Sequence, residues 1–484
     1  MLRNILSLAR QSGVYGIGSI AARAVAFLLL PYYSHLMTPA EFGAYSLFLV
    51  LVTILQPLYV HGTDIAFLRY GADATPDDQR RALGAALTQG LLVGGMLSTM
   101  LIIMAVPLAD IVVSGSSDRG GTMIRLGALT MLLDTLASYF FIYFRIKHKA
   151  LLFSFLKMTN VLFNIGLNVY FVGILKMGAV GAFYAFLYTS AATFLTLVII
   201  MGRDVKPGWT MKTARQWLAF GLPNLPAMLF MAAIEFSDRK WIESLLDITE
   251  AGIYSAGYRI GMLMNMVAQS FRFAWQPFFL QHSKDTDAQG TYARVMTYYI
   301  AFAGLLWLGC TFFLSDLLKL KLPVIGALIH PSYWPGFKVF PVIMLAHVFN
   351  GIYANLMVGV YLKDKTKIIP VVIGAAAVLN IVGNGLLIPH FGYMASAWLT
   401  VASYCLMVAL MYLYISPRYS IPYESKRIFK IVLSISLGWA LSTLNLGNWI
   451  VVWKVLLLCL VLVFWYADVL IPSERQAIKT LRRK

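Results

Sequence analysis

The chain has 484 residues, of which 60% are hydrophobic and only 12% are charged, and its formal net charge is +18. Soluble domains carry about 25% charged residues, so this composition excludes an ordinary soluble protein. Nearly uncharged stretches such as residues 91–108 and 455–471 approach the roughly 20 residues that a helix needs to cross a membrane. We therefore predict an all-α integral membrane protein, because strands of alternating polarity that would indicate a transmembrane barrel are absent from the sequence.

In chain order, the apolar stretches predict about 14 transmembrane helices. The seventh contains Pro223 and Pro226, which are expected to bend it because proline removes a backbone donor. The expected spans lie near residues 13–34, 43–62, 83–106, 123–143, 151–173, 179–202, 216–236, 251–275, 294–315, 338–362, 368–388, 393–415, 428–446 and 450–471.

The basic residues are distributed unevenly between the two sides that these spans define. With the N-terminus inside, 26 of the 39 Lys and Arg residues fall in inner segments and seven in outer loops. Cytoplasmic loops of membrane proteins are enriched in Lys and Arg, so both termini are predicted to be cytoplasmic, and the charge does not indicate a nucleic-acid partner. The three cysteines lie within spans and lack metal-ligand spacing, so we expect no disulfide, metal or cofactor.

The two halves of the chain share matching segments. Residues 41–46 (EFGAYS) resemble residues 250–255 (EAGIYS), 209 positions later. Two Lys and two Asn residues recur 216 positions apart, as Lys147, Lys149, Asn164 and Asn168 and then as Lys363, Lys365, Asn380 and Asn384. The matches predict two parallel repeats of six helices, an arrangement in which the substrate site lies between the repeats. The predicted organisation is an N-lobe at 1–204, a C-lobe at 205–416 and a two-helix appendage with a basic tail at 417–484.

The repeated residues are interpreted as architectural. Gly43 and Gly252 are expected to let the chain turn back into the membrane. Tyr45 and Tyr254 are expected to lie in the aromatic belt at the membrane interface. The repeated asparagines are expected to connect helices by hydrogen bonds.

Polar side chains within the eighth span mark a candidate site. Positions spaced by three and four residues form one polar stripe, with Arg259 at its border: Ser255, Tyr258, Met262, Asn265, Gln269, Arg272 and Gln276. At about 1.5 Å per residue, Arg259 and Arg272 lie roughly 20 Å apart along the helix, and such cations suit an anionic substrate. Hydrogen bonding between helices of a large bundle is the alternative interpretation.

Three further ionisable residues belong to the predicted site. Arg23 falls near the middle of the first span and Asp134 near the middle of the fourth, while Glu235 ends the seventh. Ionisable groups within a membrane usually face a cavity or one another. We interpret Arg23 as part of the substrate cavity, and Asp134 and Glu235 as candidates for ion coupling or an ion pair. Asp238 and Arg239, in the adjacent SDRK segment, are expected at the outer interface.

Several stretches together resemble a known family: LLLPYYSHLMTPAEFGAYSLFLVLVTILQPL, FLRYG, GLPNLPAML, SDRKWIESLLDITEAGIYSAGYRIG, FAWQPF and VLNIVGNGLLIPHFGYMASAWLT. Over most of residues 10–415 the chain is similar to the polysaccharide transporters (Wzx-type oligosaccharide flippases) of the MOP (multidrug/oligosaccharidyl-lipid/polysaccharide) superfamily. The resemblance implies two six-helix lobes that rock in alternating access around a central, often cationic cavity. It assigns Arg23, Arg259 and Arg272 to the cavity-facing cations.

The resemblance also implies a function, which is to translocate a polyprenyl-pyrophosphate-linked oligosaccharide from the inner to the outer leaflet of the bacterial inner membrane for cell-surface polysaccharide biosynthesis. The lipid bilayer, a polysaccharide polymerase and chain-length machinery are the partners it implies. The residues fit this cargo, because Arg binds phosphate through two hydrogen bonds. The Asn, Gln, Ser and Tyr residues of the stripe suit a glycan.

Other functions remain open at this point. A multidrug/cation antiporter of the same superfamily needs carboxylates within the membrane, of which Asp134 is the clearest, and a lipid II flippase is another relative. A membrane-embedded glycan polymerase or ligase needs a catalytic constellation, and the short external loops show no carboxylate pair or His/Asp cluster, so we do not expect an enzyme. Two parallel repeats with a polar seam between them do not favour a passive channel.

Overall fold

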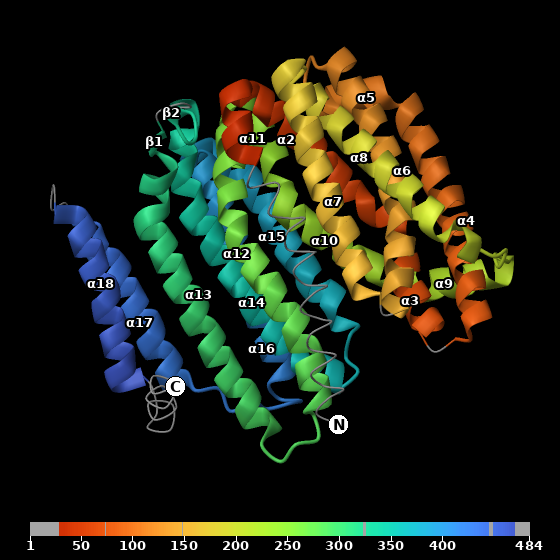
Figure 1. Ribbon diagram of the computed structural model, residues 1–484. Helices are drawn as coiled ribbons and strands as arrows, with labels where there is room; N and C mark the ends of the chain where they lie inside the picture. Colours follow the sequence, from red (N-terminus) through yellow and green to blue (C-terminus); the bar gives the residue numbers. More distant parts are fainter. Residues whose placement is uncertain (1–28, 73, 148, 323–325, 445–448, 470–484) are drawn as a thin grey trace. The chain divides into compact units, whose positions relative to one another are not determined.

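The computed structural model describes residues 29–72, 74–147, 149–322, 326–444 and 449–469. Nearly all of these residues are helical, and Figure 1 shows the helices coloured along the chain. Within the described residues, the only sheet is an antiparallel hairpin of two short strands, β1 (Lys321–Leu322) and β2 (Gly326–Ala327).

The first half of the described chain begins with a helical stretch at residues 29–36. The helices that follow are α2 (Pro39–Val60), α3 (Thr63–Ala72), α4 (Pro76–Ile103), α5 (Ala105–Val112), α6 (Ser117–Ile146), α7 (Ala150–Asn168) and α8 (Gly178–Met201). α2 and α4 begin in the same way, with a threonine (Thr38 or Thr75) whose hydroxyl oxygen accepts a backbone N–H of the first turn, followed by proline. Both features favour a helix start at these residues.

The second half contains the remaining helices. They are α9 (Met211–Gly221), α10 (Leu225–Phe236), α11 (Asp238–Leu245), α12 (Ile248–Gln281), α13 (Ala288–Leu318), α14 (Val339–Leu362), α15 (Ile368–Phe391), α16 (Tyr393–Ile415), α17 (Ser425–Ser442) and α18 (Ile450–Phe464). α9 and α10 are bent by 50° across the break at Leu222–Asn224. The bend expected from the prolines of the GLPNLP segment is therefore confirmed.

The lengths and composition of these helices identify a multi-pass membrane protein. Within the described residues, ten helices are long and apolar enough to cross a membrane, or eleven if the bent pair α9–α10 forms one span. α12 and α17 overlap the expected spans 251–275 and 428–446 without being among the ten. Most of the first expected span lies outside the described residues, so the total of 14 spans and the cytoplasmic position of both termini stay predictions.

The chain divides into two compact units. Unit 1 extends up to Ile260 and includes Ile329–Val339 and Lys367–Ser403. Unit 2 comprises Gly261–Leu328, Phe340–Thr366 and the chain from Tyr404 onward. α12, α14 and α16 contribute residues to both units, so the predicted boundaries of the N-lobe, C-lobe and appendage remain a prediction.

An aromatic core holds the first helices of unit 1 together. α6 packs against α4 and α8, and buried residues from these helices, α3, α7 and α9 form one cluster. Phe67 of α3 stacks on Trp217 of α9, with ring centroids 6.1 Å apart. Because lipid is as apolar as leucine, close packing is what holds helices together within a membrane. The cluster therefore attaches the amphipathic α9 to the bundle.

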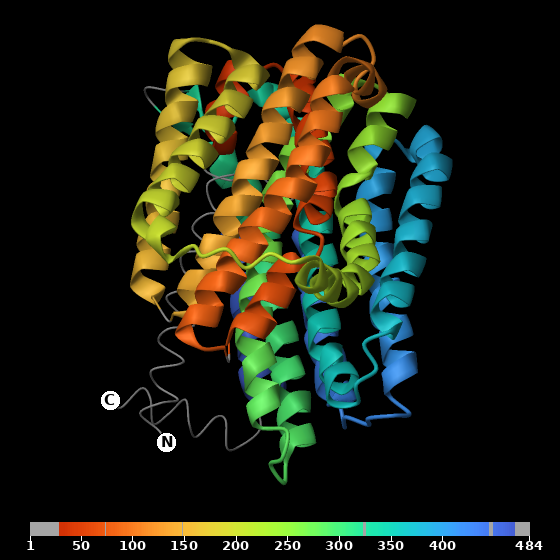
Figure 2. The ribbon, with the colours of Figure 1, turned by 90° about the vertical axis from the view of Figure 1, so that its right-hand side faces the viewer.

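The segment between α8 and α9 crosses the N-terminal end of α4 (Figure 2). Arg80 forms an ion pair with Asp204 at 3.0 Å, and Lys206 forms one with Asp77. The Lys206 N–H also donates to the Arg80 carbonyl oxygen at 3.3 Å. The segment that joins the two expected lobes is thus attached to α4 by both charge and backbone contacts.

The two copies of the repeated motif lie against each other in unit 1. Gly43 is in the first turns of α2 and Gly252 in the first turns of α12. A Cβ added at Gly43 would collide with the Ile248 carbonyl oxygen, and one at Gly252 with the Pro39 carbonyl oxygen. Neither glycine has a positive φ. The expectation that they make the chain turn is therefore wrong: they are required because the backbones of α2 and α12 approach closely.

The tyrosines of the motif are buried in the protein instead of lying in an interfacial belt. Tyr45 is 2% exposed and Tyr254 is 0% exposed. The Tyr45 ring packs edge-on against Tyr33, with centroids 5.4 Å apart, and the Tyr254 hydroxyl donates to the Asp238 carboxylate. The belt prediction is wrong, because both rings fill space beside the contact between α2 and α12.

The asparagine pair of α7 connects helices, as expected. The Asn168 side-chain amide donates to Asn164 Oδ1 at 3.0 Å, and that of Asn164 donates to Thr189 Oγ1 of α8 at 3.2 Å. Asn168 Oδ1 also accepts the Tyr33 hydroxyl at 2.5 Å. The prediction is confirmed for this pair.

In unit 2, α13, α17 and α18 lie side by side (Figure 1). Glu424, before α17, accepts the Thr297 hydroxyl of α13 at 2.6 Å and pairs with Arg427 at 2.8 Å. Lys454 of α18 pairs with Asp316 of α13 at 3.2 Å. The two C-terminal helices are thus fastened to α13 by polar contacts as well as by packing.

Candidate functional site

The predicted polar stripe lies on α12, and its members are divided between the units. Ser255, Tyr258 and Arg259 belong to unit 1, and Asn265, Gln269 and Arg272 to unit 2. Ser255 Oγ, Tyr258 OH and Asn265 Oδ1 are buried without a hydrogen-bond partner among the described residues. Buried polar atoms normally have a partner, so these three atoms are exceptions among the described residues.

The Arg259 guanidinium lies over two aromatic rings of α2. Its Cζ atom is 5.0 Å from the ring centroid of Phe42 and 5.3 Å from that of Tyr45. Within the part of the chain that the structure describes, Arg259 has neither an ion pair nor a hydrogen bond. Its half-buried charge is therefore held by cation–π attraction, and its N–H groups remain available to an anion.

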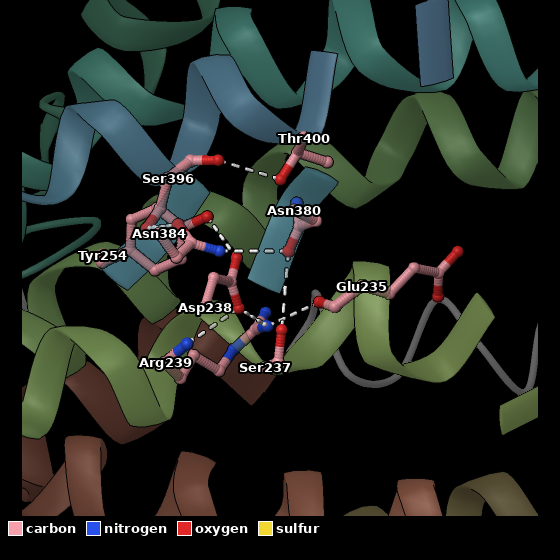
Figure 3. Close-up of polar contacts among 9 residues, drawn as sticks. All are labelled: Glu235, Ser237, Asp238, Arg239, Tyr254, Asn380, Asn384, Ser396 and Thr400. Atoms are coloured by element: carbon pink, nitrogen blue, oxygen red, sulfur yellow. Dashed lines mark hydrogen bonds and ion pairs between the residues drawn. The ribbon is translucent and has the colours of Figure 1, made fainter. Parts of the chain in front are cut away.

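A buried ion pair begins α11 (Figure 3). Asp238 and Arg239 are 0% and 6% exposed, and Arg239 Nη1 lies 2.9 Å from Asp238 Oδ1. The same nitrogen donates to the Glu235 carbonyl oxygen at 2.7 Å, while the Tyr254 hydroxyl donates to Asp238 Oδ2. The guanidinium also lies over the ring of Tyr258, with Cζ 4.1 Å from its centroid.

The charges of this pair depend on each other. Burial raises the pKa of the Asp238 carboxyl, whereas the Arg239 guanidinium and the Tyr254 hydroxyl lower it. Two buried charges are tolerated only when they are paired and hydrogen-bonded, and both conditions are met here. Both side chains are enclosed by protein, and their expected depth at the outer interface stays a prediction.

Polar contacts continue from α11 to α15 and α16 (Figure 3). The Ser237 hydroxyl donates to Asn380 Oδ1 at 3.5 Å, and the Asn384 amide donates to the same oxygen at 3.0 Å. The Ser396 hydroxyl donates to Asn384 Oδ1 at 2.6 Å, and the Thr400 hydroxyl donates to the Ser396 carbonyl oxygen at 3.0 Å. The second asparagine pair therefore connects helices as the first does, and this prediction is also confirmed.

Arg272, in unit 2, has a neutral partner. Its Nη2 donates to Asn350 Oδ1 of α14 at 2.9 Å. His347 lies one turn before Asn350 and is 0% exposed, and neither of its ring nitrogens has a hydrogen-bond partner among the described residues. An amide oxygen carries no full negative charge, so this hydrogen bond does not compensate the charge of Arg272.

The remaining predicted site residues are Asp134, Glu235 and Arg23. Asp134 lies on α6 with an exposed side chain, and Glu235 contributes its backbone carbonyl to Arg239. Arg23 lies outside the described residues. Lys157 of α7 was not among the predicted site residues, and its ammonium lies 4.0 Å from the centroid of the Phe141 ring.

The buried network of α11, α15 and α16 lies outside the site predicted from the sequence. Two signals could have indicated it: adjacent opposite charges, Asp238 and Arg239, directly after an apolar helix, and two asparagines four residues apart on the otherwise apolar α15. The two asparagines share one face of α15, because residues four apart are neighbours on a helix. Among the described residues, no group of three or more His, Cys, Asp or Glu side chains could hold a metal ion.

The sequence matches the model of one protein family. The family is described as "Polysaccharide biosynthesis protein", and the match covers residues 8–283. No curated protein sequence matches the chain significantly.

Solved structures of a flippase and of transporters share the fold. The lipid II flippase MurJ in an inward closed conformation superposes with a TM-score of 0.74 at 15% identity, covering 94% of this chain and 99% of that chain. An inward-facing MATE family multidrug transporter of the MOP superfamily gives 0.61 at 14% identity, over 82% of this chain and 95% of that chain. An outward-facing one gives 0.60 at 14% identity, over 84% and 95%. The chain therefore has a MurJ- and MATE-like fold.

Proposed function

Because the chain belongs to the polysaccharide biosynthesis protein family, we propose that it carries a lipid-linked polysaccharide precursor across a membrane. The cargo is a polyprenyl-pyrophosphate-linked oligosaccharide, and it moves from the inner to the outer leaflet of the bacterial inner membrane. The fold, shared with a flippase and with multidrug transporters, supports a transport function. A polysaccharide polymerase and chain-length machinery then use the flipped precursor.

The observation that carries this proposal is the uncompensated charge of Arg259. Arg259 borders the polar face of α12, its two neighbouring rings supply no negative charge, and its N–H groups are available. A cation in this setting is costly unless it serves a ligand or faces water. A pyrophosphate matches it, because guanidinium and phosphate form paired, charge-assisted hydrogen bonds.

The rest of the stripe supports the same cargo. Arg272 offers a second positive charge on α12, and Arg23 is proposed as a third. Ser255, Tyr258, Asn265 and Gln269 supply hydroxyl and amide groups for sugar hydroxyls. The polyprenyl chain can stay in the bilayer, so only the charged and sugar-bearing head has to cross.

The proposed cycle is alternating access by two six-helix lobes, residues 1–204 and 205–416, with residues 417–484 as an appendage. Matching motifs at offsets of 209 and 216 support this organisation. The two asparagine pairs support it too, since each bonds to the helix that follows its own, α8 or α16. The excess of Lys and Arg in the inner segments supports cytoplasmic termini.

Two other cargoes are favoured by specific observations. The structural likeness to MurJ favours lipid II, whose recognition by Arg259 would use the same chemistry. The likeness to MATE transporters, with the exposed Asp134 on α6, favours a cationic drug exchanged for an ion. Asp134 and Glu235 are the candidates for ion coupling in either case.

The test is the leaflet in which the lipid-linked glycan accumulates. Cells that lack the protein are expected to retain the glycan in the cytoplasmic leaflet. Arg259→Ala is expected to lower flipping at least about tenfold, because a hydrogen bond to a charged group contributes about 1.5–3 kcal/mol. Arg23→Ala is expected to act in the same direction.

The matched control is Arg294→Ala, which removes an exposed arginine at the start of α13 and is expected to leave flipping unchanged. Normal glycan distribution in the deletion strain, with raised sensitivity to cationic drugs, would contradict the flippase and favour the antiporter. Unchanged flipping in both Arg23→Ala and Arg259→Ala would remove these residues from the site while leaving the function in place.

A further inference from the structure

Arg259 lies on α12 two turns after the close backbone contact between α2 and α12. Gly43 and Gly252 lie on these two helices, and a Cβ at either one would be 3.0 Å from the backbone nitrogen of the other as well as in collision with a carbonyl oxygen. Phe42 is next to Gly43 in the sequence, and Arg259 lies seven residues, or two turns, after Gly252. The guanidinium therefore bridges from α12 to the face of α2 that the glycine contact brings near.

The bridge is purely aromatic on the α2 side. Phe42 is 0% exposed and Tyr45 is 2% exposed, and their ring centroids lie 5.7 Å apart, with the Arg259 Cζ 5.0 and 5.3 Å from them. Tyr333 packs edge-on against Phe42 at 5.7 Å and so fixes its ring. The attraction between a cation and aromatic rings is electrostatic, and it is strongest where water is excluded.

The same positive charge is what an anionic head group would bind. Once a pyrophosphate pairs with the guanidinium, the net charge that faces the two rings falls, and the cation–π attraction between α12 and α2 weakens with it. We propose that Arg259 is a latch at the outer end of the transport path: it holds α2 against α12 until an anionic cargo neutralises it, and neutralisation favours opening to the outer side. This inference rests on the proposed function, which supplies the cargo and the orientation.

Linkage gives the size of the effect. A ligand shifts a conformational equilibrium only by its difference in affinity for the two states. A cation–π contact contributes roughly as much as a 3- to 30-fold change in an equilibrium constant, and the upper figure applies where water is excluded. Pairing Arg259 with an anion is expected to shift the closed-to-open ratio of this contact by a factor in that range.

The test measures access to the contact from the outer side. Cys310, Cys405 and Cys459 are replaced with serine, and Ser46→Cys on α2, a position that is 4% exposed, serves as the reporter. Right-side-out vesicles are treated with a membrane-impermeant maleimide, with and without polyprenyl pyrophosphate that lacks a glycan. The lipid is expected to raise the labelling rate about 3- to 30-fold.

Variants separate the latch from ordinary packing. Phe42→Leu and Tyr45→Leu are expected to label fast without the lipid and to gain little from it, whereas Tyr45→Phe, which keeps the ring, is expected to behave like the parent. Phe48→Leu removes a buried ring of the same helix that lies beside Gly120 of α6, and its labelling is expected to stay lipid-dependent.

Arg259→Met removes the charge and keeps the length of the side chain. It is expected to raise the labelling rate of the Ser46→Cys reporter as Phe42→Leu does. The double variant that combines Arg259→Met with Phe42→Leu is expected to label no faster than either single variant, because both substitutions remove the same contact. Slow labelling in Phe42→Leu, or slower labelling of the parent in the presence of the lipid, would overturn the latch. A third outcome is that the lipid does not change the labelling rate of the parent while Phe42→Leu labels fast. This result would show that the aromatic contact holds α2 against α12, and it would overturn the proposal that the cargo releases it.

The latch and the proposed function fail in different ways. Labelling of the Phe42 and Tyr45 variants without lipid reports the latch alone. The leaflet assay on the parent protein reports the flippase alone.

Discussion

Replacing Asp238 with asparagine is expected to lower the free energy of unfolding by about 3–5 kcal/mol, because it removes the carboxylate charge that pairs with the buried Arg239 guanidinium. Asparagine has nearly the shape of aspartate, so the loss reports the charge and not a cavity. Arg239 is only 6% exposed and cannot regain water without opening the packing of α11. The measurement is the unfolding midpoint of the purified protein in detergent micelles, followed by circular dichroism.

Two matched variants test whether the loss of stability in Asp238→Asn comes from the buried, uncompensated charge. The double variant Asp238→Asn with Arg239→Gln removes both charges and is expected to recover a large part of the loss, since a missing pair is tolerated better than a lone buried charge. Arg294→Gln breaks a pair whose side chains are 50% and 66% exposed, and it is expected to cost less than about 1 kcal/mol. A loss in Asp238→Asn as small as that of Arg294→Gln would show that the buried pair does not stabilise the fold.

Gly252→Ala is expected to lower flipping about 30- to 100-fold. Its Cβ would collide with the Pro39 carbonyl oxygen, and a backbone atom cannot rotate aside as a side chain can. Forcing extra atoms into a close contact costs about 1–3 kcal/mol, and the rigidity of two helix backbones places this case at the upper end. The cost falls on the state in which α2 and α12 touch, so the Ser46→Cys reporter is expected to become accessible.

The control for this change is Gly95→Ala in α4, where an added Cβ would meet nothing within 4 Å. In that open position alanine is expected to stabilise the helix by about 0.5–1 kcal/mol and to leave flipping unchanged. Gly43→Ala is expected to reproduce the defect of Gly252→Ala, and combining the two is expected to add little, because the first Cβ has already parted the helices. Full activity in Gly252→Ala would mean that the contact need not close during transport.

For the glycines and tyrosines of the repeated motif, the sequence predicted the repeat but not the roles of the residues. The match between residues 41–46 and 250–255 pointed to a relation between two parts of the chain. The roles inferred from residue type were wrong, because glycine serves turns and close backbone contacts equally well. Tyrosine likewise suits both a membrane interface and a protein interior. Which use applies depends on the neighbour, and for Gly43 the neighbour is Ile248, 205 positions away.

Among the charged residues, the sequence likewise predicted some features and not others. Periodicity along α12 placed Arg259 on the border of a polar face, and the structure leaves its charge without an acidic partner among the described residues. Asp238 follows an apolar span, and in the structure Tyr254 donates a hydrogen bond to its carboxylate while Arg239 pairs with it. A sequence window that ends with the helix holds no information about a tyrosine 16 residues later.

By itself, the sequence determined the class of protein, the apolar helices, the bend after α9 and the helix-connecting role of the asparagines. These features depend on composition, on helical periodicity and on local backbone chemistry, all of which are contained within one segment. Only the tertiary structure decided that the two copies of the repeated motif touch, that Asp238 and Arg239 form a buried pair, and that Arg259 rests on Phe42 and Tyr45. Those outcomes depend on which helices pack together, and short-range rules do not contain that long-range choice.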